Sequence, residues 1–307
     1  MIGEIKKYKA ITPSLRHRLT VKKPKNIVKL DKNLMRTKNK TAGRNNQGKI
    51  TIRSRGSSCT HKKKLRIIDR AREFGQFSRC IVLDIQYDPN FSGFLALIEP
   101  IEENTRWQKK SKLNTEKKIE KKRLLILAAD KLKKGAIIEG NNYKKLNRFI
   151  EEKELENQNE IGNSRQLKDI PVGTLIYNLQ PSNNINNKGI YGRSAGTYCI
   201  LLKTIENKEN NKESTSIIRL PSKKLINVPS TSLASIGQVS NIDHNLTIKG
   251  KAGASRWIGR RPIVRGRAKN PVDHPMGGKT KGSGGLGKPK KTAWGKLAMG
   301  QKKKSKK

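Results

Sequence analysis

The sequence is poor in the residues that build large cores, membrane spans and covalent cross-links. Apolar residues make up 33% of the 307 residues and aromatic residues 5%, which favours small domains with long extensions over one large core. No apolar run approaches the roughly 18 residues of a membrane span, and residues 1–21 contain no signal-peptide core. The three cysteines, Cys59, Cys80 and Cys199, form no C-x-x-C pair. We therefore predict neither a zinc site nor a disulfide framework, and a reducing compartment suits the chain.

Acidic residues are also scarce. The chain has 69 Lys and Arg against 24 Asp and Glu, which gives a net charge of +45. Between Ser214 and Lys307 the only acids are Asp243 and Asp273. A free globule with this charge would repel itself, so the composition predicts a polyanionic partner whose phosphates release counterions on binding.

Arginine, glycine and proline are interleaved in the C-terminal part of the chain. Two runs, residues 250–262 and 265–278, have little to bury. Their glycines allow the backbone to approach a surface closely, and arginine pairs with phosphate through a two-pronged fork. We predict that these runs lie inside folded RNA and that Trp257 either stacks on a base or fills a small apolar pocket. The residues that we expect to form this tail clamp are Arg256, Trp257, Arg260, Arg261, Arg265, Arg267, Asn270 and His274.

Short apolar runs separated by Gly, Pro and Asn predict strands and two small β-barrels. The predicted strands span residues 81–87, 94–98, 123–128, 169–177, 198–202, 217–220 and 225–228. Two charged stretches interrupt the first half. Residues 99–122 fit either a solvated helix or a loop, and the acidic residues 143–159 have the spacing of a surface helix that faces away from RNA.

A glycine-rich loop at residues 189–197 precedes one of these strands. It lacks the spacing of a nucleotide-binding P-loop. Arg193 and Ser194 within it suit the positioning of a phosphate, and a plain hairpin turn is the alternative.

Several motifs occur together in a fixed order along the chain. They are residues 43–51, 87–90, 170–174 and 193–197, the two tail runs, and Trp294-Gly295-Lys296. In this order, and over nearly the whole chain, the motifs resemble large ribosomal subunit protein two in its bacterial and organellar form.

The resemblance implies a mostly β protein with an OB-fold barrel followed by an SH3-like barrel. It implies a basic N-terminal extension at residues 1–60, the OB-fold barrel with charged insertions at 61–162, the SH3-like barrel at 163–240 and a basic Gly/Arg-rich extension at 241–307. A family member would be a structural constituent of the large ribosomal subunit without catalytic activity of its own. It would support subunit association, and its tail with His274 would lie near the peptidyl transferase centre.

The resemblance also implies the partners. These are large-subunit rRNA, neighbouring ribosomal proteins and, across the intersubunit interface, the small subunit. No membrane, small-molecule substrate, cofactor, metal site or catalytic residue is expected, and structural Mg or K ions would be those shared with rRNA. Besides the tail clamp, we expect rRNA contacts from Arg44, Asn45, Asn46, Arg53, Arg55, His61, Lys62, Lys63, Arg70, Arg193, Ser194 and Lys251.

The sequence departs from the family pattern at several places. Met276 stands where the family has a second histidine, and a thioether cannot act as a general acid or base. Residues 279–282 read Lys-Thr-Lys-Gly in place of Gly-Glu-Gly, and the segment 55–61 is two residues longer than usual. Residues 99–122 and much of 141–161 exceed the usual length. Such divergence indicates an organellar ribosome, in the mitochondrial matrix rather than the plastid stroma.

Two other functions remain open from the sequence. An RNA-processing enzyme would use Asp273 and His274, but no nucleophile, carboxylate cluster or metal-ligand set accompanies them. A non-ribosomal basic nucleic-acid-binding protein would explain the charge, but the chain lacks a helix-turn-helix, heptads or zinc fingers and is poor in aromatic residues for stacking. Co-sedimentation with large ribosomal subunits after a salt wash distinguishes the three.

Overall fold

The structure is a computed structural model that divides into two compact units. It describes residues 4–25, 27–37, 41–56, 64–71, 79–101, 123–140, 161–181, 188–205, 214–278 and 289–298. The predicted surface helix at 143–159 and all but the first three residues of the charged stretch 99–122 lie outside these ranges. Unit 1 comprises Met1–Lys38 and Lys62–Lys251, and unit 2 comprises Asn39–His61 and Ala252–Lys307.

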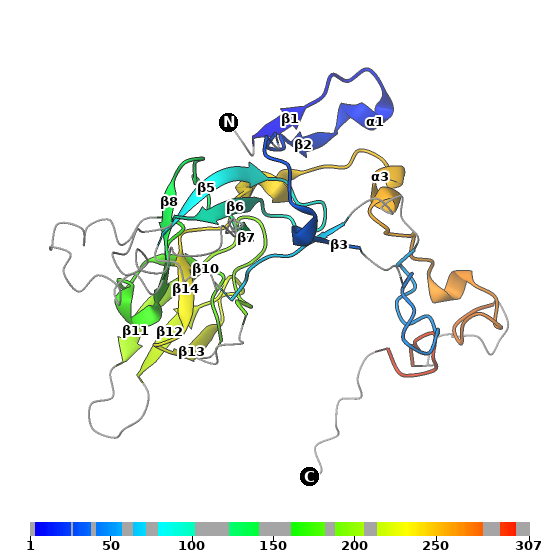
Figure 1. The fold of residues 1–307 in the computed structure, drawn as a ribbon. Helices are drawn as coiled ribbons and strands as arrows, with labels where there is room; N and C mark the ends of the chain where they lie inside the picture. Colours follow the sequence, from blue (N-terminus) through cyan, green and yellow to red (C-terminus); the bar gives the residue numbers. More distant parts are fainter. Residues whose placement is uncertain are drawn as a thin grey trace, which may run out of the picture. The chain divides into compact units, whose positions relative to one another are not determined.

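The first barrel of unit 1 is built on a four-stranded antiparallel sheet with the order β7-β6-β5-β8 (Figure 1). The strands are β5 (Arg79–Gln86), β6 (Leu95–Pro100), β7 (Leu124–Leu127) and β8 (Ile137–Glu139). The long strand β5 pairs with β6 along its length and with β8 at its start, and its register shifts between Val82 and Asp84. Such a bulge bends and twists a strand, which is how a small sheet curls around its core.

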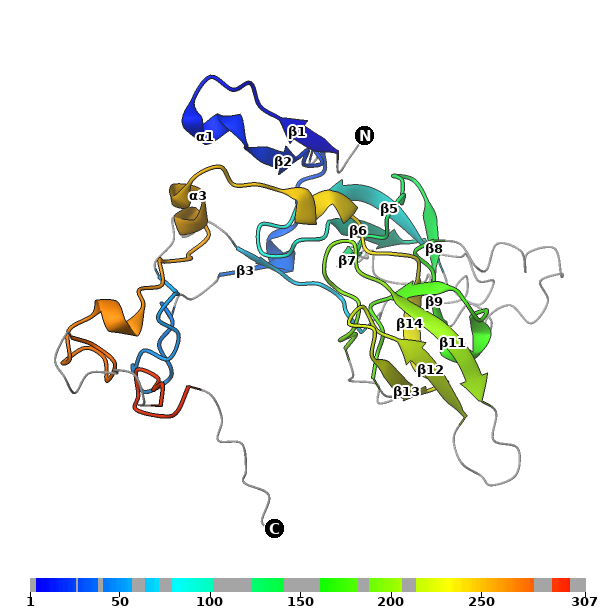
Figure 2. The ribbon, with the colours of Figure 1, turned by 180° about the vertical axis from the view of Figure 1, so that it is seen from behind.

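The second barrel is built on a six-stranded antiparallel sheet with the order β13-β12-β11-β10-β14-β9 (Figure 2). The strands are β9 (Ser164–Gln166), β10 (Leu175–Tyr177), β11 (Cys199–Ile205), β12 (Thr215–Arg219), β13 (Leu225–Pro229) and β14 (Leu233–Ile236). Alternate residues point inward, so Cys199 and Leu201 of β11 are fully buried beside Ile176 and Ile218. The predicted mostly β fold, with an OB-fold barrel followed by an SH3-like barrel, is confirmed.

One predicted strand is too long. Residues 169–177 do not form one strand, because a 3-10 turn occupies Leu167–Asp169 and β10 begins only at Leu175. Pro171 and Gly173 explain the difference. The Thr174 hydroxyl donates to the Pro171 carbonyl at 2.7 Å, and Gly173 has a φ of +88°, so the chain turns where the apolar pattern had indicated extension.

A shared apolar cluster joins the two barrels within unit 1. Leu95 and Leu127 of the first barrel pack with Tyr177 and Val239 of the second, and all four are buried. The Tyr177 hydroxyl donates to the Leu127 carbonyl at 3.2 Å, which satisfies the one polar atom of that side chain. The two barrels therefore pack against each other through a common core and are not independent domains joined by a linker.

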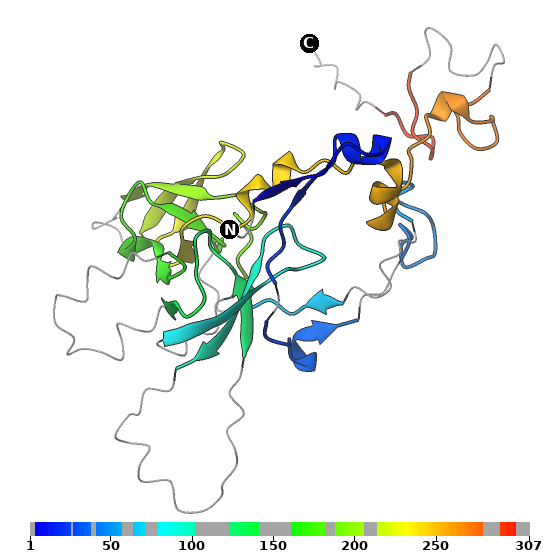
Figure 3. The same cartoon turned by 90° about the horizontal axis from the view of Figure 1, so that it is seen from above.

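The N-terminal segment of unit 1 has regular secondary structure of its own. Strands β1 (Ile5–Lys7) and β2 (Leu19–Val21) pair antiparallel, and helix α1 (Pro13–Arg16) lies between them. The hairpin is anchored by an antiparallel bridge between Leu19 and Ile248, beside the 3-10 turn η7 at Ile242–Leu246 (Figure 3). A second short pair, β3 (Met35–Arg36) and β4 (Leu65–Arg66), follows the 3-10 turn η1 at Lys32–Leu34.

A buried carboxylate attaches the N-terminal segment to the first barrel. Asp84 follows the bulge in β5, and its side chain is fully buried. One carboxylate oxygen accepts hydrogen bonds from the backbone N–H groups of Ile27 at 2.9 Å and Val28 at 3.2 Å, and the other pairs with the Lys134 ammonium. Burial alone would raise the pKa of Asp84, but the Lys134 contact and the two backbone hydrogen bonds outweigh it, so the pKa is lowered.

Candidate nucleic-acid interface

Unit 2 brings together two basic segments from opposite ends of the chain. Arg55 and Arg260 form an antiparallel bridge. Two backbone hydrogen bonds flank it, from the Gly56 N–H to the Gly259 carbonyl at 3.1 Å and from the Arg261 N–H to the Ser54 carbonyl at 2.9 Å. Backbone pairing therefore places the arginines of the N-terminal arm beside those of the tail.

The N-terminal arm enters this pairing through a self-contained loop. The Asn45 side-chain oxygen accepts hydrogen bonds from the N–H groups of Gln47 at 3.1 Å and Lys49 at 2.9 Å, and Arg44 donates to the Gly48 carbonyl at 2.9 Å. The Asn45 oxygen thus holds the loop in shape. Asn46 is exposed and able to contact a ligand.

The arginines of the tail clamp are solvent-exposed on irregular backbone. Helix α3 (Ala252–Trp257) ends at Trp257, which is 45% exposed, and the 3-10 turn η8 spans Gly266–Ala268. Exposed guanidinium groups on a backbone rich in turns have room to form two-pronged contacts with phosphate. The exposed predicted residues of the tail are Lys251, Arg256, Trp257, Arg260, Arg261, Arg265, Arg267 and Asn270.

His274 is half-buried and has a defined position. Its Nδ1 accepts a hydrogen bond from the Met276 N–H at 3.0 Å, which leaves Nε2 to carry the proton of the neutral ring. The ring lies against Gly266, where an added Cβ would come within 2.4 Å of His274 Cε1. The backbone closes around it, because the Gly278 N–H donates to the Lys269 carbonyl at 2.9 Å. His274 therefore holds the tail loop in one shape.

Unit 1 contains a separate pair of predicted residues. The Arg70 guanidinium lies 4.6 Å from the centre of the Phe91 ring. Burial, and then the nearby positive charge of Arg193, lower the pKa of Arg70, while Asp88 acts in the opposite direction. An anion beside Arg70 would offset this unfavourable environment for the guanidinium charge.

The glycine-rich loop that carries Arg193 is fixed from both sides. The Ser92 hydroxyl accepts a hydrogen bond from the Ala195 N–H at 3.0 Å, and the Ser194 carbonyl accepts one from the Thr197 hydroxyl at 2.7 Å. Ser194 itself is exposed. These contacts fix the loop as a turn.

The predicted residues therefore fall into two groups, one in each unit. Unit 2 contains the arm and the tail clamp, and unit 1 contains Arg70, Arg193, Ser194 and Lys251. The predicted residues His61, Lys62 and Lys63 lie outside the described ranges.

Sequence reasoning missed the aromatic side chains that basic residues cover. Arg53 lies 5.4 Å from the ring centre of Trp294, and Arg18 lies 4.9 Å from that of Tyr8. Lys23 lies 4.1 Å from the ring centre of Tyr87. For Tyr8 and Trp294 the available signal was an aromatic residue among basic residues, since cations are attracted to the face of an aromatic ring.

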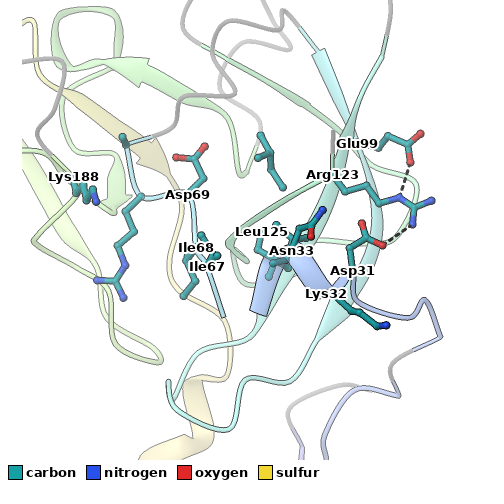
Figure 4. A pocket seen from close by; sticks show the side chains of 14 residues that line it. Asp31, Lys32, Asn33, Ile67, Ile68, Asp69, Glu99, Arg123, Leu125 and Lys188 are labelled. Atoms are coloured by element: carbon teal, nitrogen blue, oxygen red, sulfur yellow. Dashed lines mark hydrogen bonds and ion pairs between the residues drawn. The ribbon is translucent and has the colours of Figure 1, made fainter. Parts of the chain in front are cut away.

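A cavity of about 1080 Å³ in unit 1 has a different character (Figure 4). Ile67, Ile68 and Leu125 contribute apolar side chains to its lining. On one side Arg123 bridges Asp31 at 3.7 Å and Glu99 at 3.3 Å. Asp69 and the basic residues Lys32, Arg70 and Lys188 also line it, so carboxylates and cations share this cavity.

Among the described residues no group of three or more His, Cys, Asp and Glu is placed to hold a metal ion. In the same ranges no helix has the length and apolar character needed to cross a membrane.

Comparison with known proteins decides the family. Residues 31–140 match the model for Ribosomal Proteins L2, RNA binding N-terminal domain, and residues 160–295 match the model for Ribosomal Proteins L2, C-terminal domain. The chain belongs to the ribosomal protein L2 family. The first match covers the strands of the first barrel, and the second covers the second barrel, the tail clamp and Trp294.

Two similar proteins are named as large ribosomal subunit proteins. Large ribosomal subunit protein uL2m of Reclinomonas americana is 37% identical over 316 residues, covering 98% of this chain and 94% of that protein. Large ribosomal subunit protein uL2 of Amoebophilus asiaticus (strain 5a2) is 35% identical over 290 residues, covering 92% of this chain and 88% of that protein. The resemblance seen in the sequence motifs is confirmed.

Proposed function

We propose that this L2 family member is a structural, rRNA-binding constituent of the large subunit of an organellar ribosome, in the mitochondrial matrix. The observation that carries the proposal is the backbone pairing of Arg55 with Arg260. Family membership supports the large subunit as the assembly, and the similarity to a protein named uL2m supports an organelle.

The electrostatics of unit 2 require a polyanion. Residues 39–61 contain no acid, and residues 252–307 contain one, Asp273. An interior of folded RNA supplies the counter-charge, and release of condensed counterions supplies a large part of the affinity. Direct contacts to phosphate position the protein, and the arm and tail together would grip one RNA region from two sides.

The role of His274 in this account is positioning. Its Nδ1 is engaged by the Met276 N–H, and its ring is packed on Gly266. The loop that it holds would lie near the peptidyl transferase centre, where the RNA performs the chemistry. We assign the protein no catalytic activity of its own, and we infer that it also contacts neighbouring ribosomal proteins and supports association with the small subunit.

Sedimentation of ribosomes from fractionated organelles tests the proposal. Mitochondria and, where present, plastids are lysed separately, and the large subunits are washed with high salt and separated on a gradient. The expected result is that this chain remains with the mitochondrial large subunit after the wash. Recovery in soluble fractions, or with DNA, would overturn the proposal.

A further inference from the structure

The C-terminal end of the described chain is a tight hairpin with a tryptophan at its tip. Lys291 and Leu297 form an antiparallel bridge, and the Gly295 N–H donates to the Thr292 carbonyl at 3.0 Å. Gly295 has a φ of +82°, the conformation required to close a three-residue loop with a bulge. This geometry puts Trp294 on the turn, where 58% of its surface is exposed.

An arginine from the N-terminal arm covers part of this tryptophan. The Arg53 guanidinium carbon lies 5.4 Å from the centre of the Trp294 ring, within the range of a cation–π contact. The two residues come from opposite ends of the chain, and the hairpin lies against the arm within unit 2 (Figures 1 and 3). Arg53 thus limits the motion of the indole, while more than half of the Trp294 surface stays open among the described residues.

The residues around Arg53 and Trp294 indicate which kind of ligand this site would bind. Lys290, Lys291 and Lys296 of the hairpin are exposed, and the described part of unit 2 holds one acid, Asp273. A phosphate chain would satisfy the lysines but leave the indole in water. An unpaired nucleotide satisfies both, because its base stacks on an aromatic ring or a guanidinium plane while its phosphates meet the cations.

We propose that Arg53 and Trp294 form a stacking platform for one unpaired RNA base. The platform binds a looped-out or single-stranded nucleotide rather than a duplex, whose bases are already stacked. This inference rests on the proposed function, since it names the element of RNA that one part of the same interface takes.

Binding of two ligands with matched charge tests the platform. The full-length chain, with Trp107→Phe and Trp257→Phe so that Trp294 is the only tryptophan, is titrated with single-stranded oligoadenylate and with inorganic polyphosphate of equal charge. The expected result is that oligoadenylate quenches Trp294 fluorescence and polyphosphate does not. Equal quenching by both ligands would overturn the proposal.

Substitutions in the otherwise native chain give the second readout. Trp294→Leu is expected to weaken oligoadenylate binding about tenfold, the typical loss for one stacked base, and to leave polyphosphate binding unchanged. Trp294→Phe should restore most of the affinity, because a phenyl ring still stacks. Arg53→Lys keeps the positive charge but removes the planar guanidinium group. It should weaken oligoadenylate binding and leave polyphosphate binding unchanged.

The outcomes separate the platform from the proposed function. If the native chain binds RNA and sediments with large subunits, but Trp294→Leu weakens both ligands equally or neither, the platform is wrong and the function stands. If the native chain neither binds RNA nor sediments with large subunits, the proposed function fails first.

Discussion

Arg55 and Arg260 face each other across an antiparallel bridge that joins the N-terminal arm to the C-terminal tail. Side chains at directly opposite positions lie on the same side of the pair, and like charges there are destabilising. Both arginines are exposed, so water screens part of this repulsion in the free protein. A phosphate that contacts both guanidinium groups would turn the repulsion into attraction, which links this backbone pairing to RNA binding.

The first prediction concerns these two arginines. Arg55→Ala and Arg260→Ala should each reduce the salt dependence of rRNA binding by about one unit in the slope of log K against log salt, because each removes about one phosphate contact. Filter binding over a salt series measures the slope. Lys168→Ala, at an exposed position of the 3-10 turn in the second barrel, is the control and should leave the slope unchanged. Identical slopes for all variants would contradict the assignment.

The second prediction concerns the loop that His274 holds. Gly266→Ala should loosen it, since the new Cβ would come within 2.4 Å of the His274 ring and displace it from the Met276 N–H. Amide exchange at Met276 should accelerate about fivefold, the equivalent of one hydrogen bond. Gly253→Ala in α3 is the matched control, because nothing lies within 4 Å of its added Cβ. Unchanged exchange in Gly266→Ala would show that His274 does not hold the loop.

The third prediction concerns Asp84. Its folded pKa is lower than its unfolded value, so its contribution to stability is present above the unfolded pKa and is lost as pH falls through the folded pKa. Asp84→Asn should lower the free energy of unfolding at neutral pH by about 3 kcal/mol, because the Lys134 contact and the charge-assisted backbone bonds are lost.

Urea unfolding at pH 7 and at acidic pH measures this effect. The difference between Asp84→Asn and the native protein should begin to shrink as the pH falls below about 4, where Asp84 of the unfolded chain takes up a proton, and should be lost as the pH falls through the lower folded pKa. Asp130→Asn, at a half-buried carboxylate after β7, should change stability by less than about 0.5 kcal/mol. A difference that is constant from neutral to acidic pH would show that the charge of Asp84 contributes nothing.

The fourth prediction concerns Cys199. Its thiol is fully buried in the core of the second barrel, and burial raises its pKa to about 11. At pH 8 only about one thiol in a thousand is then ionised, and the thiolate is the reactive form. Iodoacetamide labelling followed by mass spectrometry should find Cys199 unmodified in native protein and modified in urea. Rapid labelling in the native state would place Cys199 at the surface.

The strands could be predicted because their signal is local. Alternation over residues 81–87 and 198–202 corresponds to β5 and β11, whose inward residues fill the two cores. The exception at residues 169–177 came from Pro171 and Gly173, whose turn chemistry overrode the apolar pattern. The hairpin formed by β1 and β2 has strands of three residues each, which is too short for a clear periodic signal.

The sequence composition predicted which residues belong to the candidate interface. It did not predict which of those residues contact one another. Exposed arginines were named from charge and glycine content, without knowledge of their neighbours. The pairing of Arg55 with Arg260 and the contact of Arg53 with Trp294 join residues far apart in the sequence. No local sequence pattern encodes such contacts, because they form only when the tertiary fold brings distant segments of the chain together.

Cross-linking within intact large subunits tests the central claim most directly. Ultraviolet irradiation of purified organellar large subunits, followed by mass spectrometry of peptide–nucleotide adducts, locates the residues that touch rRNA. We expect adducts concentrated in residues 41–56 and 252–278, on both sides of the bridge between Arg55 and Arg260. Adducts confined to the barrels, with neither arm nor tail in contact with rRNA, would contradict it.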